Sequence, residues 1–445
     1  MTDAVDVLSP TSAPIARWLL VATLVLLPID WFVPTGLALR EAGAKPASPF
    51  LAAILVCLLL RSAGRLELGL QGRRFLHACA LIVCVGCIAF GINLVAGWSP
   101  LDWNRSPIAQ FVVQLAMFLL FAAILASLLL VLRDADSRKF ILQALPFVAL
   151  FHFAVFLLEA THVLNSSSRL LLLFRNDNGT IDRASGLMSE PSYWGTFAAL
   201  FGVPMMLIGP GWRIWQRVLG AMLLVSAFVV MAKTMFIVLA AQLMYMFFTP
   251  YRSRWARPIL VAMAVVLGSS AMALFQNTAA TDLDQNLSSV MRVGSTALSM
   301  NVAKAGYAFT GIGFGQFHFF YTPDHAPDFL FLSKEAQGQF SHESQQRAST
   351  YNLASRLLVE TGFAGAALFF GAIGAVLWRA RRATDDATRV GLLFAYGALG
   401  FLMTQDTYCY PPLAFGLALV LSTADDGARQ STCVGAVEPS RMPVV

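Results

Sequence analysis

Long apolar runs separated by short polar segments extend over most of the chain. Runs near 20 residues allow a helix to cross a hydrocarbon core of about 30 Å, and they are far longer than the roughly ten residues of a barrel strand. The pattern predicts an all-α polytopic membrane protein with about twelve transmembrane helices. The expected spans are 15–34, 46–61, 75–96, 107–132, 140–163, 190–209, 218–232, 234–250, 258–276, 352–378, 389–405 and 409–423.

Two connections are longer than tight loops. One is 164–189, and the other is 277–351, between the ninth and tenth spans. Connections this long usually carry function or a small domain. Within the second loop, 286–308 has spaced apolar residues and is expected to form a helix against the membrane, while GIGFGQF (311–317) is expected to turn.

The loops therefore divide the chain into four parts. Residues 1–276 hold the first nine spans and 277–351 the large outer loop, 352–423 hold the last three spans, and 424–445 form a tail.

Composition agrees with the pattern. The chain is 57% hydrophobic and only 13% charged, with a mean hydropathy of +0.67. A water-soluble protein of 445 residues could not bury so much apolar surface in one or two cores. A soluble enzyme is therefore excluded.

Basic residues set the expected orientation. With the N-terminus inside, the cytoplasmic loops carry sixteen lysines and arginines, against seven in the opposite connections shorter than 30 residues. Because basic residues favour the cytoplasmic side, both termini are expected there. The net charge of +6 then reflects attraction to anionic lipid, and no nucleic-acid partner is expected.

The start of the chain and the cysteines suggest no further chemistry. Asp3 and Asp6 precede the first span without a basic segment, so this span is expected to remain as an uncleaved anchor. Cys84 and Cys87 form a CxxC inside an apolar span with no second ligand pair nearby, which favours a structural role. No metal, cofactor or extracytoplasmic disulfide is predicted.

Some basic residues fall on the side predicted to be outside, although lysine and arginine favour the cytoplasmic side. Arg183, Lys233 and Arg292 all fall at outer span ends or in outer loops. Each alone is compatible with a side chain that reaches for lipid headgroups. Together, beside two unusual loops, they favour binding of a phosphate.

Arg183 opens the segment RASGLMSEPSYWG (183–195), directly before a predicted helix. Pro191 suits the first helical position, and Ser189 or Glu190 suits the cap. The free N–H groups of this helix would point toward Arg183 and could hold a phosphate. Glu190 either stabilises the helix dipole or acts directly in catalysis or acceptor binding.

This segment, with Arg292, GIGFGQF and STYNLASRLLVETGFAG (349–365), resembles the superfamily of bacterial O-antigen polymerases (Wzy) and O-antigen ligases (WaaL). Members have about ten to fourteen helices, a large late periplasmic loop and an Arg-x-x-Gly segment opening a middle helix. The resemblance covers residues 180–365 by motif and the whole chain by topology. It implies a multi-pass protein of the bacterial inner membrane with its active site facing the periplasm.

The resemblance also implies the reaction. The donor is an undecaprenyl-diphosphate-linked glycan, and the acceptor is a lipid-linked repeat unit or lipid A-core, with membrane lipids and a chain-length regulator as further partners. Transfer needs neither metal nor cofactor, because arginines can neutralise the leaving diphosphate. The diphosphate is expected to meet Arg183, Arg292, Lys233 and Arg356, and His342, Glu343 and Glu190 are the candidate catalytic residues.

One departure bears on the branch of the superfamily. Ligases show a His-Asn pair at the end of the large loop, and here Tyr351 precedes Asn352. The Glu-Pro-Ser form of the middle motif also favours the polymerase. His342 could supply an equivalent imidazole, which keeps a ligase or a protein O-oligosaccharyltransferase open. A flippase is a more distant alternative, since it would not explain the large loop.

Two further pairs lie at the ends of spans. Glu159 and His162 are one turn apart and either line the site or serve packing or a paired hydrogen bond. Arg356 and Glu360 are four apart and are expected to pair, with contact between Arg356 and the phosphates as the alternative.

Overall fold

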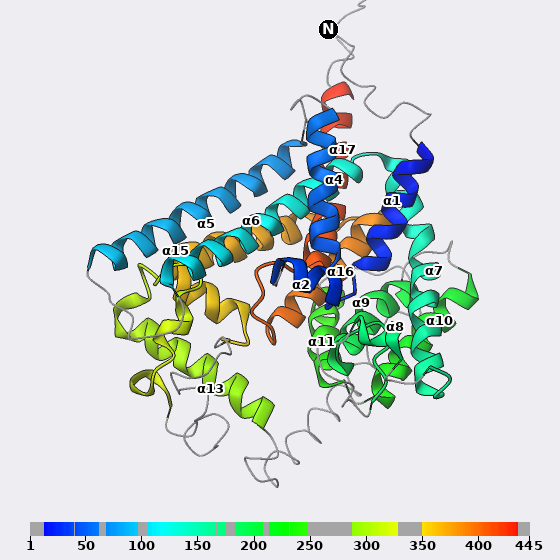
Figure 1. The fold of residues 1–445 in the computed structure, drawn as a ribbon. Helices are drawn as coiled ribbons and strands as arrows, with labels where there is room; N and C mark the ends of the chain where they lie inside the picture. The colour runs from blue at the N-terminus through cyan, green and yellow to red at the C-terminus, as the bar shows by residue number, and fades with distance from the viewer. Residues whose placement is uncertain are drawn as a thin grey trace, which may run out of the picture.

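The protein is described by a computed structural model covering residues 13–39, 41–61, 68–96, 106–164, 168–174, 183–207, 213–230, 232–247, 287–327 and 349–434. Within these ranges all regular structure is helical (Figure 1). The longer helices are α1 (Ala13–Leu26), α4 (Ala47–Arg61), α5 (Leu70–Val95), α6 (Pro107–Val131), α7 (Ala135–Ala160), α9 (Pro191–Leu207), α10 (Ile214–Val229), α11 (Lys233–Phe247), α13 (Leu287–Val302), α15 (Leu353–Ala380), α16 (Asp386–Leu402) and α17 (Pro411–Val434).

Short helices fill the connections. They are α2 (Val33–Leu39), α3 (Glu41–Ala44), α8 (Arg169–Leu172), a π turn (Ala303–Tyr307) and two 3-10 turns (Gln316–Phe320 and Pro323–His325).

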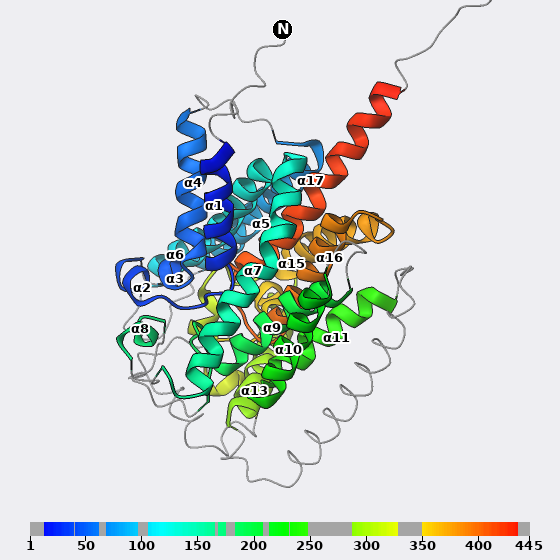
Figure 2. The same ribbon diagram turned by 90° about the vertical axis from the view of Figure 1, so that its right-hand side faces the viewer.

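Every predicted span overlaps a helix except 258–276, which lies outside the described residues; in 15–34 the helix ends at Leu26. In the described part, α5, α6, α7 and α15 are long and apolar enough to cross a membrane, and α4, α10, α11 and α17 contain shorter apolar stretches. These helices support a membrane protein. The start of α1, the end of α4 and the end of α17 lie at one end of the molecule (Figures 1 and 2).

The helices pack in two groups joined by α16 and α17. The α5, α6 and α15 helices run side by side in one group, and α9 packs against α10 and α11 in the other (Figure 1). The α16 and α17 helices approach closely, since a Cβ on Gly391 would lie 2.8 Å from the Gly416 carbonyl oxygen. Small residues permit such contact between membrane helices. One continuous apolar core extends through both groups.

The α15 helix breaks at Gly362, where φ is 67° and ψ is −176°. A break frees carbonyls that the helix would otherwise satisfy. The GIGFGQF turn supplies the missing donors: Ile312 N–H bonds the Val359 carbonyl at 2.9 Å, and Gly313 N–H bonds the Glu360 carbonyl at 2.8 Å. The expected turn is confirmed, and it is docked inside the bundle.

The α13 helix confirms the helix expected within 286–308. Its Leu298 and Val302 are buried against Ile312, Phe317 and Tyr321 of the same loop, together with Val359 of α15. These residues of α13 are thus covered by protein, whereas Val293 and Met300 are exposed, and the expected contact with the membrane stays a prediction.

Candidate functional site

The RASG turn (183–186) is fixed by a carboxylate from α7. Glu159 is buried and accepts hydrogen bonds from Ser185 N at 2.9 Å and Gly186 N at 2.7 Å. Gly186 has a φ of 63° and packs on Phe156, which explains why glycine stands three residues after Arg183. Glu159 therefore shapes the turn that presents Arg183.

A second carboxylate holds the other end of the segment. Asp30, which follows α1, accepts hydrogen bonds from the backbone N–H of Ser189 at 2.9 Å and from the Ser189 hydroxyl. The predicted start of α9 at Pro191 is confirmed. The Glu190 carbonyl accepts from Tyr193 and Trp194 N–H groups, so Glu190 is the capping residue and its side chain stays exposed.

The start of α11 adjoins the start of α9. Thr234 Oγ1 donates to the Ser192 carbonyl at 2.7 Å, and Gly195 lies directly against Ala232. Lys233 is the first residue of α11, and its side chain lies outside the described part of the chain.

Arg292 of α13, about 100 residues downstream, lies near the start of α9. Arg292, Glu190 and Asp30 all lie near enough to the Tyr193 phenol of α9 to act on it electrostatically. Arg292 is half-buried, and its buried Nε has no hydrogen-bond acceptor among the described residues. A buried donor without an acceptor is costly, and an anion would satisfy it.

Arg183 is exposed and donates from Nη1 to the Val230 carbonyl at 3.2 Å, at the C-terminal end of α10. This places the guanidinium toward the end of α10. A phosphate held jointly by Arg183 and the N–H groups of α9 stays a prediction. Arg183 lies at a groove of about 810 Å³ between α7 and α10, lined by apolar residues such as Phe153, Met222 and Val225. Glu159 and His162 line the same groove, and the Glu159 carboxylate there holds the RASG turn.

Arg356 lies in a buried network. It is 2% exposed, its Nε lies 3.2 Å from Glu360 Oε1, and its Nη2 donates to Gln114 Oε1 at 2.8 Å. Its Nη1 donates to the Asp406 carbonyl at 2.6 Å, and the guanidinium stacks 4.3 Å above the Tyr408 ring. The expected pair with Glu360 is confirmed. This enclosure favours a structural role for Arg356 over contact with a diphosphate.

His342 and Glu343, the candidate bases, lie outside the described residues. At the end of the large loop, Asn352 caps α15 by accepting from Ala354 N at 2.8 Å. Thr350 N donates to Asp406 Oδ2 at 3.0 Å. The loop therefore rejoins the bundle beside the Arg356 network.

Several contacts had no signal in the sequence. Asp30 and Glu159 bind backbone N–H groups 159 and 27 positions away, and His152 Nε2 lies 3.0 Å from the Val25 carbonyl. A backbone partner leaves no residue-type pattern. Only the isolated charge inside an apolar span could have identified these residues.

In the described ranges no group of three or more His, Cys, Asp or Glu residues is placed to hold a metal ion. No family model, curated protein or solved structure matches the chain.

Proposed function

We propose that the protein is a membrane glycosyltransferase that polymerises lipid-diphosphate-linked oligosaccharide units at the outer face of the bacterial inner membrane. The donor would be an undecaprenyl-diphosphate-linked glycan and the acceptor a second lipid-linked unit. Arg183 and Arg292 hold the diphosphate as negative charge builds on it, with Lys233 as a third candidate. Fixed guanidinium forks can do this without a metal.

The observation that carries the proposal is the buried Arg292 Nε without an acceptor among the described residues, near enough to Tyr193 to act on it electrostatically. Arg183 and Arg292 lie far apart in the sequence, and α13 brings Arg292 into range of Tyr193 beside the exposed Glu190 carboxylate. The Arg292 Nε, which has no acceptor among the described residues, supports an anion at this position. A guanidinium and a carboxylate together suit a reaction in which an anion leaves while a hydroxyl attacks.

The groove beside Arg183 supports a lipid-linked donor. Its volume of about 810 Å³ is lined mainly by apolar side chains, and the charged Arg183 stands among them. A ligand with a long hydrocarbon chain and an anionic head matches this distribution.

The acceptor needs a base or an orienting group. His342 and Glu343 fill this role in the proposal, because their loop returns to the bundle at Thr350, close before α15. Glu190 is the candidate among the described residues, since it is exposed beside Tyr193. A positioned base contributes about 10²–10⁴-fold to a rate.

The test is a reaction of the purified protein with a synthetic polyprenyl-diphosphate-linked oligosaccharide. A ladder of products that differ by one repeat unit supports the polymerase. A single transfer to added lipid A-core, with no ladder, identifies the alternative ligase. Movement of the intact donor across a vesicle membrane without new glycosidic bonds identifies a flippase and overturns the proposal.

The base is tested in the same assay. His342→Ala is expected to lower turnover while donor binding is retained, since the arginines still hold the diphosphate. Wild-type turnover in both His342→Ala and Glu343→Ala would remove these two residues from the reaction.

A further inference from the structure

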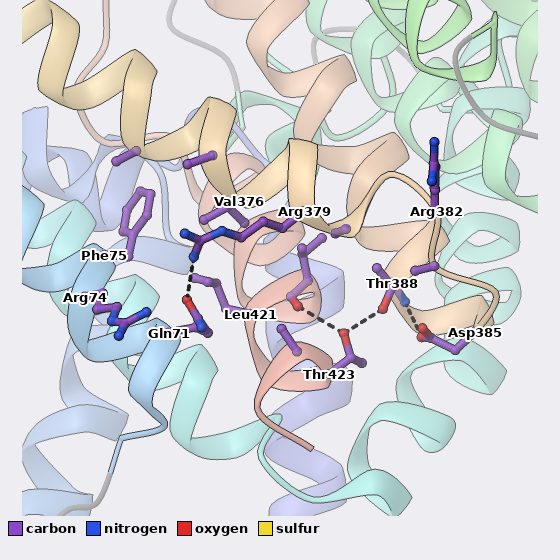
Figure 3. A pocket seen from close by; sticks show the side chains of 16 residues that line it. Gln71, Arg74, Phe75, Val376, Arg379, Arg382, Asp385, Thr388, Leu421 and Thr423 are labelled. Carbon is purple, nitrogen blue, oxygen red and sulfur yellow. Dashed lines mark hydrogen bonds between the residues drawn. The ribbon is translucent and has the colours of Figure 1, made fainter. Parts of the chain in front are cut away.

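A second cavity lies away from the proposed site, between α5, α15, α16 and α17 (Figure 3). Its volume is about 590 Å³, and its wall is mainly apolar, with Phe75, Ala372, Ala375, Val376, Val420 and Leu421. It is formed where α5 begins, α15 ends and α16 begins. The sequence predicts the cytoplasmic side for this end of the bundle.

Arginines lie at two edges of this apolar wall. Arg74 of α5 and Arg379 of α15 stand on one side of the cavity, and Arg382 stands at the opposite edge (Figure 3). All three side chains are exposed. Arg379 Nη1 donates to Gln71 Oε1 at 3.2 Å, which still leaves further guanidinium donors.

The other polar groups of the cavity are engaged within the protein. Asp385 is the acidic lining residue, and its Oδ1 accepts from Thr388 N at 2.7 Å as the cap of α16. The Thr388 and Thr423 hydroxyls lie 2.6 Å apart, and Thr423 also donates to the Val420 carbonyl at 3.0 Å. The lining charges are thus three arginines against one aspartate, so the cavity favours an anion.

We propose that this cavity binds an anionic phospholipid. Arg74 and Arg379 would hold the headgroup phosphate through forked, charge-assisted hydrogen bonds, and one acyl chain would lie along Ala372, Ala375 and Val376. Basic pockets between membrane helices on the cytoplasmic side suit such headgroups. A soluble anion would leave the apolar wall without a partner. The proposal does not depend on the glycosyltransferase function.

Bound lipid would fasten the end of α15 to α5, α16 and α17. The far half of α15 carries Arg356, Glu360 and the break at Gly362, which receives the GIGFGQF turn. A ligand that binds only the folded arrangement stabilises it by mass action.

The experiment is native mass spectrometry of the detergent-purified full chain with dioleoylphosphatidylglycerol, compared with dioleoylphosphatidylcholine, which has the same chains and no net charge. The wild type should retain the phosphatidylglycerol preferentially. Arg74→Gln with Arg379→Gln should weaken retention roughly tenfold or more, as expected for loss of charge-assisted bonds. Inorganic phosphate should compete only weakly.

The matched control is Arg73→Gln with Arg381→Gln, which removes the same charge from neighbouring positions outside the cavity lining. This pair should keep the lipid preference. Ala375→Trp fills the cavity without changing charge and should also abolish retention.

Equal weakening by the control pair would mean general surface charge and would overturn the site. Equal retention of the two lipids by the wild type, or full competition by inorganic phosphate, would overturn the lipid assignment. Wild-type retention in the Ala375→Trp variant would place the lipid elsewhere.

Discussion

Glu159 accepts the backbone N–H of Gly186 at 2.7 Å, although the two residues are 27 positions apart in the chain. The same carboxylate oxygen also accepts Ser185 N–H. The turn that presents Arg183 is therefore held by α7 as well as by the left-handed backbone of its own Gly186.

Glu159→Ala should destabilise this turn. It leaves two buried N–H groups without an acceptor, each costing about 1–3 kcal/mol in the free energy of unfolding. Thermal unfolding in detergent checks the change, and Glu159→Gln should recover part of it through its remaining carbonyl oxygen. The exposed Glu190→Gln serves as the control, with an expected effect below about 0.5 kcal/mol. An unchanged unfolding midpoint in Glu159→Ala would contradict the assigned role.

Gly311→Ala should disrupt the docking of the large loop. Its φ is 73°, and a Cβ would lie 2.7 Å from the Glu360 carbonyl oxygen. The left-handed backbone alone costs a side chain about 1–2 kcal/mol. Gly371→Ala in α15 is the matched control, because nothing lies within 4 Å of its Cβ position. That control should leave stability unchanged or raise it, and similar destabilisation in both variants would refute the prediction.

Arg356→Met should be among the most destabilising single changes in α15. The change leaves the buried Glu360 without its counter-ion. Breaking such a pair lowers the free energy of unfolding by about 3–5 kcal/mol. The double variant Arg356→Met with Glu360→Gln should cost clearly less, because no unpaired charge remains and the new amide oxygen can still accept from Tyr408. Denaturant unfolding of both variants and of Glu360→Gln alone measures the difference. Additive costs would show that the two residues are not coupled.

Arg183→Ala and Arg292→Ala should each lower transfer from the lipid-diphosphate donor by roughly 10- to 100-fold, the effect of losing a charge-assisted hydrogen bond. Lysine at position 183 should rescue only part, since it keeps the charge and loses the fork. Arg169→Ala and Lys304→Ala remove exposed basic residues of the same two loops and should retain activity. Wild-type transfer in both arginine variants would remove them from the site.

Reporter fusions test the predicted orientation of the chain across the membrane. A reporter that is active only outside the cytoplasm should be active when fused near residue 330 and silent near residue 383. The reverse pattern would contradict the orientation inferred from the basic residues.

Much of the helical pattern could be predicted because it follows from runs of apolar residues. The start of α9 at Pro191 and the turn at 311–317 were also predictable, since proline and glycine restrict or free the backbone locally. The network around Arg356 was predicted only as its pair with Glu360. Gln114, Asp406 and Tyr408 join it through tertiary packing, which no local spacing encodes.

The candidate site also divides into residues that the sequence could identify and contacts that depend on tertiary packing. Arg183 and Arg292 could be selected because basic residues on the predicted outer side oppose the bias of membrane insertion. The direction of Arg183 toward Val230 could not, because it depends on how α10 ends beside the RASG turn. Asp30 and Glu159 were equally inaccessible, since their partners are backbone groups distant in the sequence.

The docking of the GIGFGQF turn into the break of α15 limits how this chain can change in length. The turn donates the hydrogen bonds that α15 lacks at its break. Removing the turn would leave carbonyl groups of α15 without donors inside the bundle. Insertions and deletions should therefore be tolerated on either side of residues 308–317 and rejected within them. A homologue with a shortened loop must either keep this segment or carry an unbroken α15.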